Sequence, residues 1–145
     1  MLDQCGRTID YLRLSVTDLC NYRCQYCMPA DGVAKRPHTE ILSLEELVEI
    51  SEACIACGVR KIRLTGGEPL VRRGIVDLCR KLRQLPGLEE LCITTNASLL
   101  PQLAQPLRKF VDSDFAGEFL SEALLTWSMA GKSFDEIYGM MEKHF

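Results

Sequence analysis

The sequence predicts an α/β fold, namely an incomplete parallel α/β barrel followed by a C-terminal helical hairpin. Three short stretches alternate apolar and polar residues, and stretches with helical spacing separate them, which is typical of βαβ units in a parallel sheet. Strands of a doubly wound sheet are apolar on both faces. Each strand here has one polar face, so we expect helices on the outer face only. Functional residues should then lie on the inner face and at the carboxyl ends of the strands.

The first expected strand covers residues 9–16. Leu12, Leu14 and Val16 form its apolar face, and Arg13 lies on its polar face. A loop with many turn-forming residues follows, and we expect it to leave the carboxyl end of this strand.

A helix is expected next, because Ser43 and Glu46 form a capping box and apolar residues follow with helical spacing until Gly58. Cys54 and Cys57 lie three residues apart in it and could form a metal-ligand pair. Residues at this spacing share the buried face of a helix, so core packing is the favoured interpretation. The remaining expected elements are a strand over 60–65, a helix from Gly74 to the turn at Pro86, a strand over 91–96 and a helix over 98–109.

The last part of the chain differs in character, so we divide the sequence into a barrel part, 1–107, and a helical tail, 108–145. Apolar residues over 119–127 have helical spacing, and Ser133 with Glu136 caps a second helical stretch. These two stretches predict an αα-hairpin.

Composition indicates one globular domain. The chain has 145 residues, 47% of them hydrophobic, and a net charge of -3, which gives no overall attraction to nucleic acid or acidic membranes. No apolar run reaches transmembrane length, and the N-terminus does not have the layout of a signal peptide. We therefore expect a cytoplasmic protein whose eight cysteines stay reduced outside any metal site.

Three cysteines follow the first strand in the pattern Cys20-x-x-x-Cys24-x-x-Cys27. An odd number at such close spacing does not suit disulfides, and structural zinc usually takes four ligands from two separated pairs. An iron–sulfur cube can be held by three thiolates, with one iron left open for chemistry. The alternative is that these are free cysteines packed as small hydrophobic residues, which their polar surroundings disfavour.

The cysteine pattern resembles that of the radical S-adenosylmethionine (SAM) superfamily when it is taken together with Tyr26 before the last cysteine and a Gly-Gly-Glu-Pro motif at 66–69. Further segments resemble the GTP 3',8-cyclase family of molybdenum cofactor biosynthesis, namely 10–18, 26–29 and 61–73. The resemblance extends from about residue 3 to about residue 107 and implies half of a radical-SAM-type α/β barrel.

The resemblance implies that Cys20, Cys24 and Cys27 bind a [4Fe–4S] cluster, that SAM binds its open iron, and that an electron donor reduces it. It implies SAM contacts from Tyr26, Gly66, Gly67 and Glu68. It implies GTP as the substrate, with contacts from Arg13, Arg63 and Thr94, while Lys61 lies on the same strand face as Arg63. Because the cofactor carries the chemistry, no side chain is assigned a catalytic role.

The residues themselves also point to an anion. Strand alternation directs Arg13, Lys61 and Arg63 from two strands to the same interior, where unpaired positive charge is costly. A triphosphate would neutralise this charge. The alternative is that Lys61 and Arg63 are solvated charges at an edge.

The sequence also departs from the GTP 3',8-cyclase pattern. Ala97 stands where the family has glycine, and no cysteine follows Cys92 to hold the family's second cluster. We therefore expect a truncated, frame-shifted or fused chain, with a dimer or a partner chain completing the barrel. The alternative functions are a non-catalytic remnant that binds only a cluster, and a different radical SAM enzyme.

Overall fold

The computed structural model describes residues 4, 6–24, 27, 37 and 40–112, so the helical tail predicted over 108–145 lies outside this part except for residues 108–112. Its elements, in chain order, are β1 (Tyr11–Ser15), α1 (Leu44–Ala56), β2 (Lys61–Thr65), the short 3-10 helix η2 (Pro69–Val71), α2 (Ile75–Arg83), β3 (Glu90–Ile93) and α3 (Leu100–Leu107). Across the described residues, no helix has the length and apolar character needed to cross a membrane.

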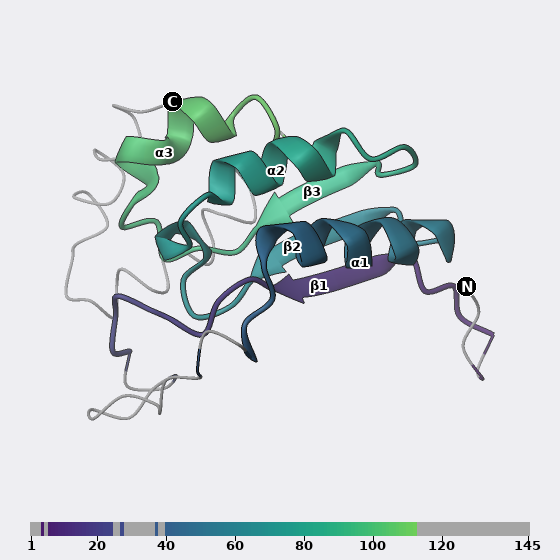
Figure 1. The fold of residues 1–145 in the computed structure, drawn as a ribbon, viewed down its shortest axis with the longest axis horizontal. Coiled ribbons are helices and arrows are strands. Elements are labelled where there is room, and N and C mark those ends of the chain that lie inside the picture. The colour runs from purple at the N-terminus through teal and green to yellow at the C-terminus, as the bar shows by residue number, and fades with distance from the viewer. Residues whose placement is uncertain (1–3, 5, 25–26, 28–36, 38–39, 113–145) are drawn as a thin grey trace.

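The three strands form one parallel sheet in the order β1-β2-β3 (Figure 1). Arg13 is the register partner of Arg63, and Arg63 is the partner of Cys92. This open α/β sheet confirms the predicted fold class. The third strand is shorter than expected, because it ends at Ile93 and not at Asn96.

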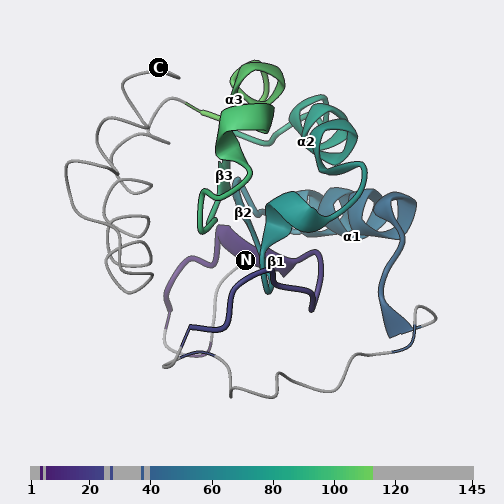
Figure 2. The ribbon, with the colours of Figure 1, turned by 90° about the vertical axis from the view of Figure 1, so that its left-hand side faces the viewer.

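One face of the sheet forms the hydrophobic core. The helices cover this face, and the view along the sheet edge shows α1 and α2 on one side of the strands (Figure 2). The fully buried side chains include Leu64 on β2 and Leu91 on β3, together with Leu47, Leu78 and Leu82 on the helices. The opposite face carries the polar residues of the strands, as alternation predicted.

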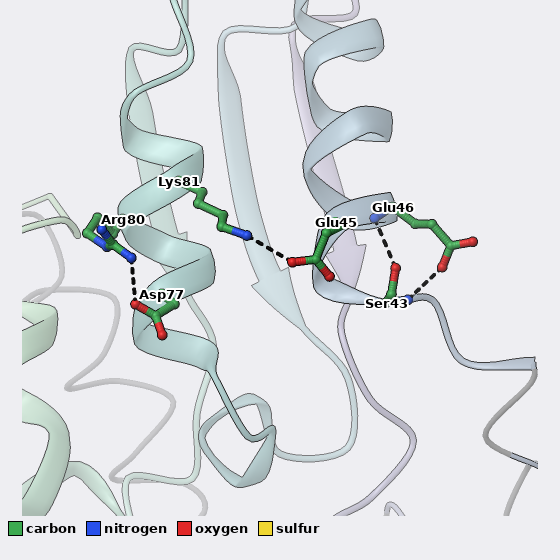
Figure 3. A network of polar contacts seen from close by, with 6 residues as sticks. All are labelled: Ser43, Glu45, Glu46, Asp77, Arg80 and Lys81. Atoms are coloured by element: carbon green, nitrogen blue, oxygen red, sulfur yellow. Dashed lines mark hydrogen bonds and ion pairs between the residues drawn. The ribbon is translucent and has the colours of Figure 1, made fainter.

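A capping box begins α1 (Figure 3). The Glu46 amide donates to Ser43 Oγ at 3.1 Å, and the Ser43 amide donates to Glu46 Oε2 at 2.7 Å. Lys81 of α2 forms an ion pair with Glu45 of α1 at 2.9 Å. Such exposed pairs contribute at most about 1 kcal/mol, so apolar packing fixes the two helices.

The expected core role of both α1 cysteines is half right. Cys54 packs partly buried against the core, whereas Cys57 is exposed and serves as the C-cap of α1. The buried face of α1 is formed by Leu47, Ser51 and Ile55. Cys57 lies off this face and is therefore exposed to solvent.

Asp112 lies against the outer edge of β3. Its amide donates to the Leu91 carbonyl at 3.2 Å, and its carboxylate accepts from the Leu91 amide at 2.9 Å. Arg83 at the end of α2 donates to the same carboxylate at 3.1 Å. The chain therefore satisfies the backbone groups of Leu91 on the side away from β2.

Candidate functional site

The three cysteines lie on the loop that leaves the carboxyl end of β1. Cys20 and Cys24 are half-buried, and Cys27 is exposed. The Cys27 amide donates to the Cys24 carbonyl at 3.0 Å, which makes a turn between them. Arg23 donates through Nη1 to the Cys20 and Tyr22 carbonyls, both at 2.9 Å. These bonds shape the loop from within.

The thiols are close enough to affect one another's charge. Burial raises the pKa of the Cys24 thiol, and the Cys20 and Cys27 thiolates raise it further. A cationic iron–sulfur cluster would offset this repulsion, so the donor set fits such a cluster in its chemistry. In the described part of the chain, no three Cys, His, Asp or Glu side chains are already gathered into a group that could hold a metal ion.

The Gly-Gly-Glu-Pro motif packs directly on the start of the cysteine loop. The Gly67 amide donates to the Thr17 carbonyl and the Glu68 amide to the Leu19 carbonyl, both at 2.8 Å. A Cβ on Gly66 would lie 2.3 Å from the Thr17 oxygen, and one on Gly67 would lie 2.4 Å from the Leu19 oxygen. Both glycines are exposed on their other side. The glycines therefore permit a close approach between two strands of backbone and leave a bare backbone surface facing outward.

The Glu68 side chain points into the protein and is only 1% exposed. Its Oε1 accepts from the Leu70 amide at 2.9 Å and from Thr95 Oγ1 at 2.6 Å, and its Oε2 accepts from the Asn96 amide at 2.6 Å. Burial raises the pKa of Glu68, although these three hydrogen bonds act in the opposite direction. The carboxylate thus joins the loop after β2 to the loop after β3.

A second polar contact joins the loop after β3 to the cysteine loop. Asn96 Nδ2 donates to Asn21 Oδ1 at 2.9 Å, and Asn21 Nδ2 donates to Ser98 Oγ at 2.7 Å. Together with Glu68 these residues connect the three loops that follow β1, β2 and β3. We call Asn21, Glu68, Asn96 and Ser98 the three-loop network.

Sequence patterns did not single out the three-loop network as a unit. Asn21 lies between two candidate ligands, and Asn96 was expected to continue the third strand. The family resemblance predicts that Glu68 contacts SAM, whereas its three hydrogen bonds in the structure go to the chain itself. Asn and Ser after strands signal turns, which was the only available indication of such contacts.

Two arginines lie side by side on the polar face of the sheet. Arg13 is exposed and Arg63 half-buried, and they are register partners on β1 and β2. Arg63 Nη1 donates to Thr94 Oγ1 at 3.4 Å, which brings the predicted GTP residues Arg13, Arg63 and Thr94 to neighbouring positions.

Lys61 and Cys92 complete this face. Lys61 forms an ion pair with Glu90 at 3.0 Å, so an anion would compete with a carboxylate for its ammonium. Cys92 lies beside Arg63 in register, and its thiol donates to Glu90 Oε1 at 3.2 Å. Burial, together with Glu90, raises the pKa of Cys92 to about 11, so this thiol stays protonated. Tyr26, the predicted SAM contact, lies outside the described residues.

Comparison with protein families places the site in context. The model of the radical SAM superfamily matches residues 14–142, which is most of the chain. The chain belongs to the radical SAM superfamily. The match includes all three cysteines and the Gly-Gly-Glu-Pro motif, and it continues into the tail beyond residue 107.

Close relatives carry the name GTP 3',8-cyclase. The chain is 61% identical to the Pseudomonas putida (strain W619) protein over 107 residues, covering 74% of this chain and 32% of that protein. It is 56% identical to the Geobacter sulfurreducens protein over 108 residues, covering 74% of this chain and 33% of that protein. The chain thus spans about a third of the length of these relatives.

Proposed function

We propose that this chain holds a [4Fe–4S] cluster and SAM and corresponds to the N-terminal part of a GTP 3',8-cyclase. The observation that carries the proposal is the direct backbone contact between the Gly-Gly-Glu-Pro loop and the cysteine loop, at Thr17 and Leu19. Two motifs that are distant in sequence therefore meet at the carboxyl ends of β1 and β2, where parallel α/β folds place their ligands.

Cys20, Cys24 and Cys27 would hold the cluster, and the exposed backbone of Gly66 and Gly67 would accept the SAM amino group. When bound, the cluster and SAM supply reductive cleavage of the sulfonium by one electron from an external donor. Tyr26 would contact SAM, and Glu68 would contribute through the backbone that it fixes. The chain's own task is to bind, orient and exclude water.

The substrate proposal rests on the paired arginines and on the relatives' name. Arg13 and Arg63 present two positive charges on one sheet face, and Thr94 adds a hydroxyl beside Arg63. This combination suits the triphosphate of GTP, because guanidinium groups bind phosphate through paired hydrogen bonds. Lys61 is the weaker candidate because Glu90 already pairs with it.

The whole reaction would need more than residues 1–107. The sheet formed by the described residues has three strands and is open. We propose that a partner chain or a second copy completes the barrel in the cytoplasm. The chain alone is then expected to cleave SAM without cyclising GTP.

The test is an anaerobic assay on the purified chain after reconstitution with iron and sulfide. We expect about four iron atoms per chain. With dithionite and SAM we expect 5'-deoxyadenosine, and with added GTP little cyclised nucleotide. A Cys20, Cys24 and Cys27 triple alanine variant should lose both the iron and the 5'-deoxyadenosine. A Cys54 and Cys57 double alanine variant should keep them.

Each contrary result has a distinct meaning. Iron retained by the triple variant would contradict the ligand assignment. Cyclised GTP from the chain alone would show that the described half barrel is sufficient. Cluster-loaded protein that yields neither product would favour the non-catalytic alternative.

A further inference from the structure

We propose that Asn21 is a positioning residue that fixes Cys20 in place before cluster or SAM arrives, so that Cys20 is the preset ligand among the three cysteines. The inference rests on the proposed cluster site and goes beyond it by assigning unequal roles to the three thiols. Its basis is the three-loop network, in which the Asn21 side chain bonds to Asn96 and Ser98.

The orientation of the Asn21 amide is determined by its neighbours. The Ser98 amide, which can only donate, bonds to Asn96 Oδ1 at 3.0 Å and so directs Asn96 Nδ2 toward Asn21. Asn21 Oδ1 must then accept from Asn96, and its Nδ2 donates to Ser98 Oγ. Both polar ends of Asn21 are therefore held by the loop after β3.

That loop is in turn held by Glu68. The Asn96 amide donates to the buried Glu68 carboxylate at 2.6 Å, and Thr95 Oγ1 donates to the same group at 2.6 Å. Hydrogen bonds to a buried carboxylate are stronger than neutral ones. The anchor of Asn21 is therefore the glutamate of the Gly-Gly-Glu-Pro motif.

Cys20 is held from both sides. The residue before it, Leu19, accepts through its carbonyl from the Glu68 amide at 2.8 Å, and the residue after it, Asn21, is held through its side chain. Among the described residues, the backbone hydrogen bond of Cys24 and Cys27 joins these two residues to each other, inside the cysteine loop. Cys20 is therefore held in place by residues of two other loops, whereas in the described part of the chain the positions of Cys24 and Cys27 depend on the cysteine loop alone.

The experiment measures thiol alkylation by iodoacetamide in the metal-free chain, followed by tryptic mass spectrometry. Cleavage after Arg13 and Arg23 isolates Cys20 on its own peptide. The exposed Cys57 serves as an internal fast reference, and the buried Cys79 reports unfolding. We expect Cys20 to react more slowly than Cys57 in the unaltered chain.

The Asn21→Ala variant should raise the Cys20 rate about fivefold or more, because it removes the two hydrogen bonds of the Asn21 amide and each is worth about a factor of five. Asn21→Asp should leave Cys20 slower than Asn21→Ala does, because its carboxylate can still accept from Asn96 Nδ2. The control Gln102→Ala, which removes an exposed amide on α3, should leave the Cys20 rate unchanged.

Ser98→Ala provides a second route to the same result, and it decides the matter if Asn21→Ala exposes Cys79. An unchanged Cys20 rate in both alanine variants would overturn the inference, as would Cys20 reacting as fast as Cys57 in the unaltered chain. Iron uptake is measured separately. If the unaltered chain shows the alkylation pattern but takes up no iron, the proposed function is contradicted, whereas the inference that Asn21 fixes Cys20 still holds.

Discussion

At the scale of single residues, Ala97 shows how backbone strain and side-chain burial can have opposite and nearly equal effects on stability. Its φ of 62° lies in the left-handed region, and the residue is fully buried in the loop after β3. An L-residue in this region costs about 1–2 kcal/mol. Burial of its methyl group returns about 0.8 kcal/mol, and alanine restricts the unfolded chain by about a further 0.4–1 kcal/mol relative to glycine.

We therefore expect Ala97→Gly to change the free energy of unfolding by less than about 0.5 kcal/mol, because relieved strain offsets both losses. The matched control is Ala104→Gly in α3, where alanine is 9% exposed and has no such strain. That variant should cost roughly 1.5–2 kcal/mol from helix propensity and methyl burial together. Urea unfolding measures both, and equal losses in the two variants would contradict the argument.

At the scale of elements, the β1–β2 ladder continues past the ends of both strands. The Val16 amide donates to the Thr65 carbonyl at 2.9 Å, and the Gly67 and Glu68 amides then donate back to the Thr17 and Leu19 carbonyls. The glycines make this continuation possible by removing side chains from the contact. The position of the cysteine loop therefore depends on the strand register.

Gly67→Ala should consequently destabilise the chain by about 1–3 kcal/mol, the usual cost of forcing atoms into a packed site. The new Cβ would lie 2.6 Å from the Leu19 backbone carbon as well as close to its oxygen, so the backbone must move. Glu52→Ala is the control, because Glu52 is exposed in the interior of α1 and alanine suits a helix. Thermal unfolding with equal midpoints for the two variants would show that the loops do not press on each other as described.

The sequence predicted the existence and type of the elements well and their ends less well. Alternation located the strands because one face of each is buried and the other polar. The third strand was placed too far along because Thr94, Thr95 and Asn96 look suited to a strand. In the structure Thr95 and Asn96 instead bond to Glu68, a partner 27 and 28 residues away, which no local pattern can reveal.

At the scale of the whole molecule, the helices cover one face of the sheet, and the opposite face carries the positively charged side chains of Arg13, Lys61 and Arg63. Arg13 makes no hydrogen bond or ion pair with another described residue, while Lys61 is paired with Glu90. We expect Arg13→Ala to weaken GTP binding about tenfold or more, since charge-assisted bonds to phosphate are lost. Lys61→Ala should have a smaller effect, because its ammonium is already neutralised.

Calorimetric titration with GTP provides the measurement, with Arg80→Ala as the control. Arg80 is exposed on α2, on the helix-covered side of the sheet, and pairs with Asp77 at 2.8 Å. Equal affinities for the unaltered chain and the Arg13→Ala variant would remove the anion site from this face. A loss of affinity in Arg80→Ala would point to GTP binding on the helix side.

The candidate site was predictable to the extent that it consists of contiguous motifs. The cysteines and the Gly-Gly-Glu-Pro motif are visible in the sequence, and strand alternation assigned Arg13 and Arg63 to one face. The three-loop network was not predictable, because it depends on contacts between Asn21, Glu68 and Asn96 over 28 and 75 residues. Alternation gives the face of a side chain and not the partner of its polar atoms.

The contact between Asp112 and β3 bears on how this sheet can grow. An edge strand offers a row of backbone groups to any chain that can add a strand, which is a route both to assembly and to aggregation. Asp112 occupies the amide and the carbonyl of Leu91 at once, and Arg83 holds its carboxylate there. Any strand added at this edge, including one from a partner that completes the barrel, would have to displace Asp112 before it could pair along the full length of β3. The chain thereby protects the edge with one of its own acidic side chains.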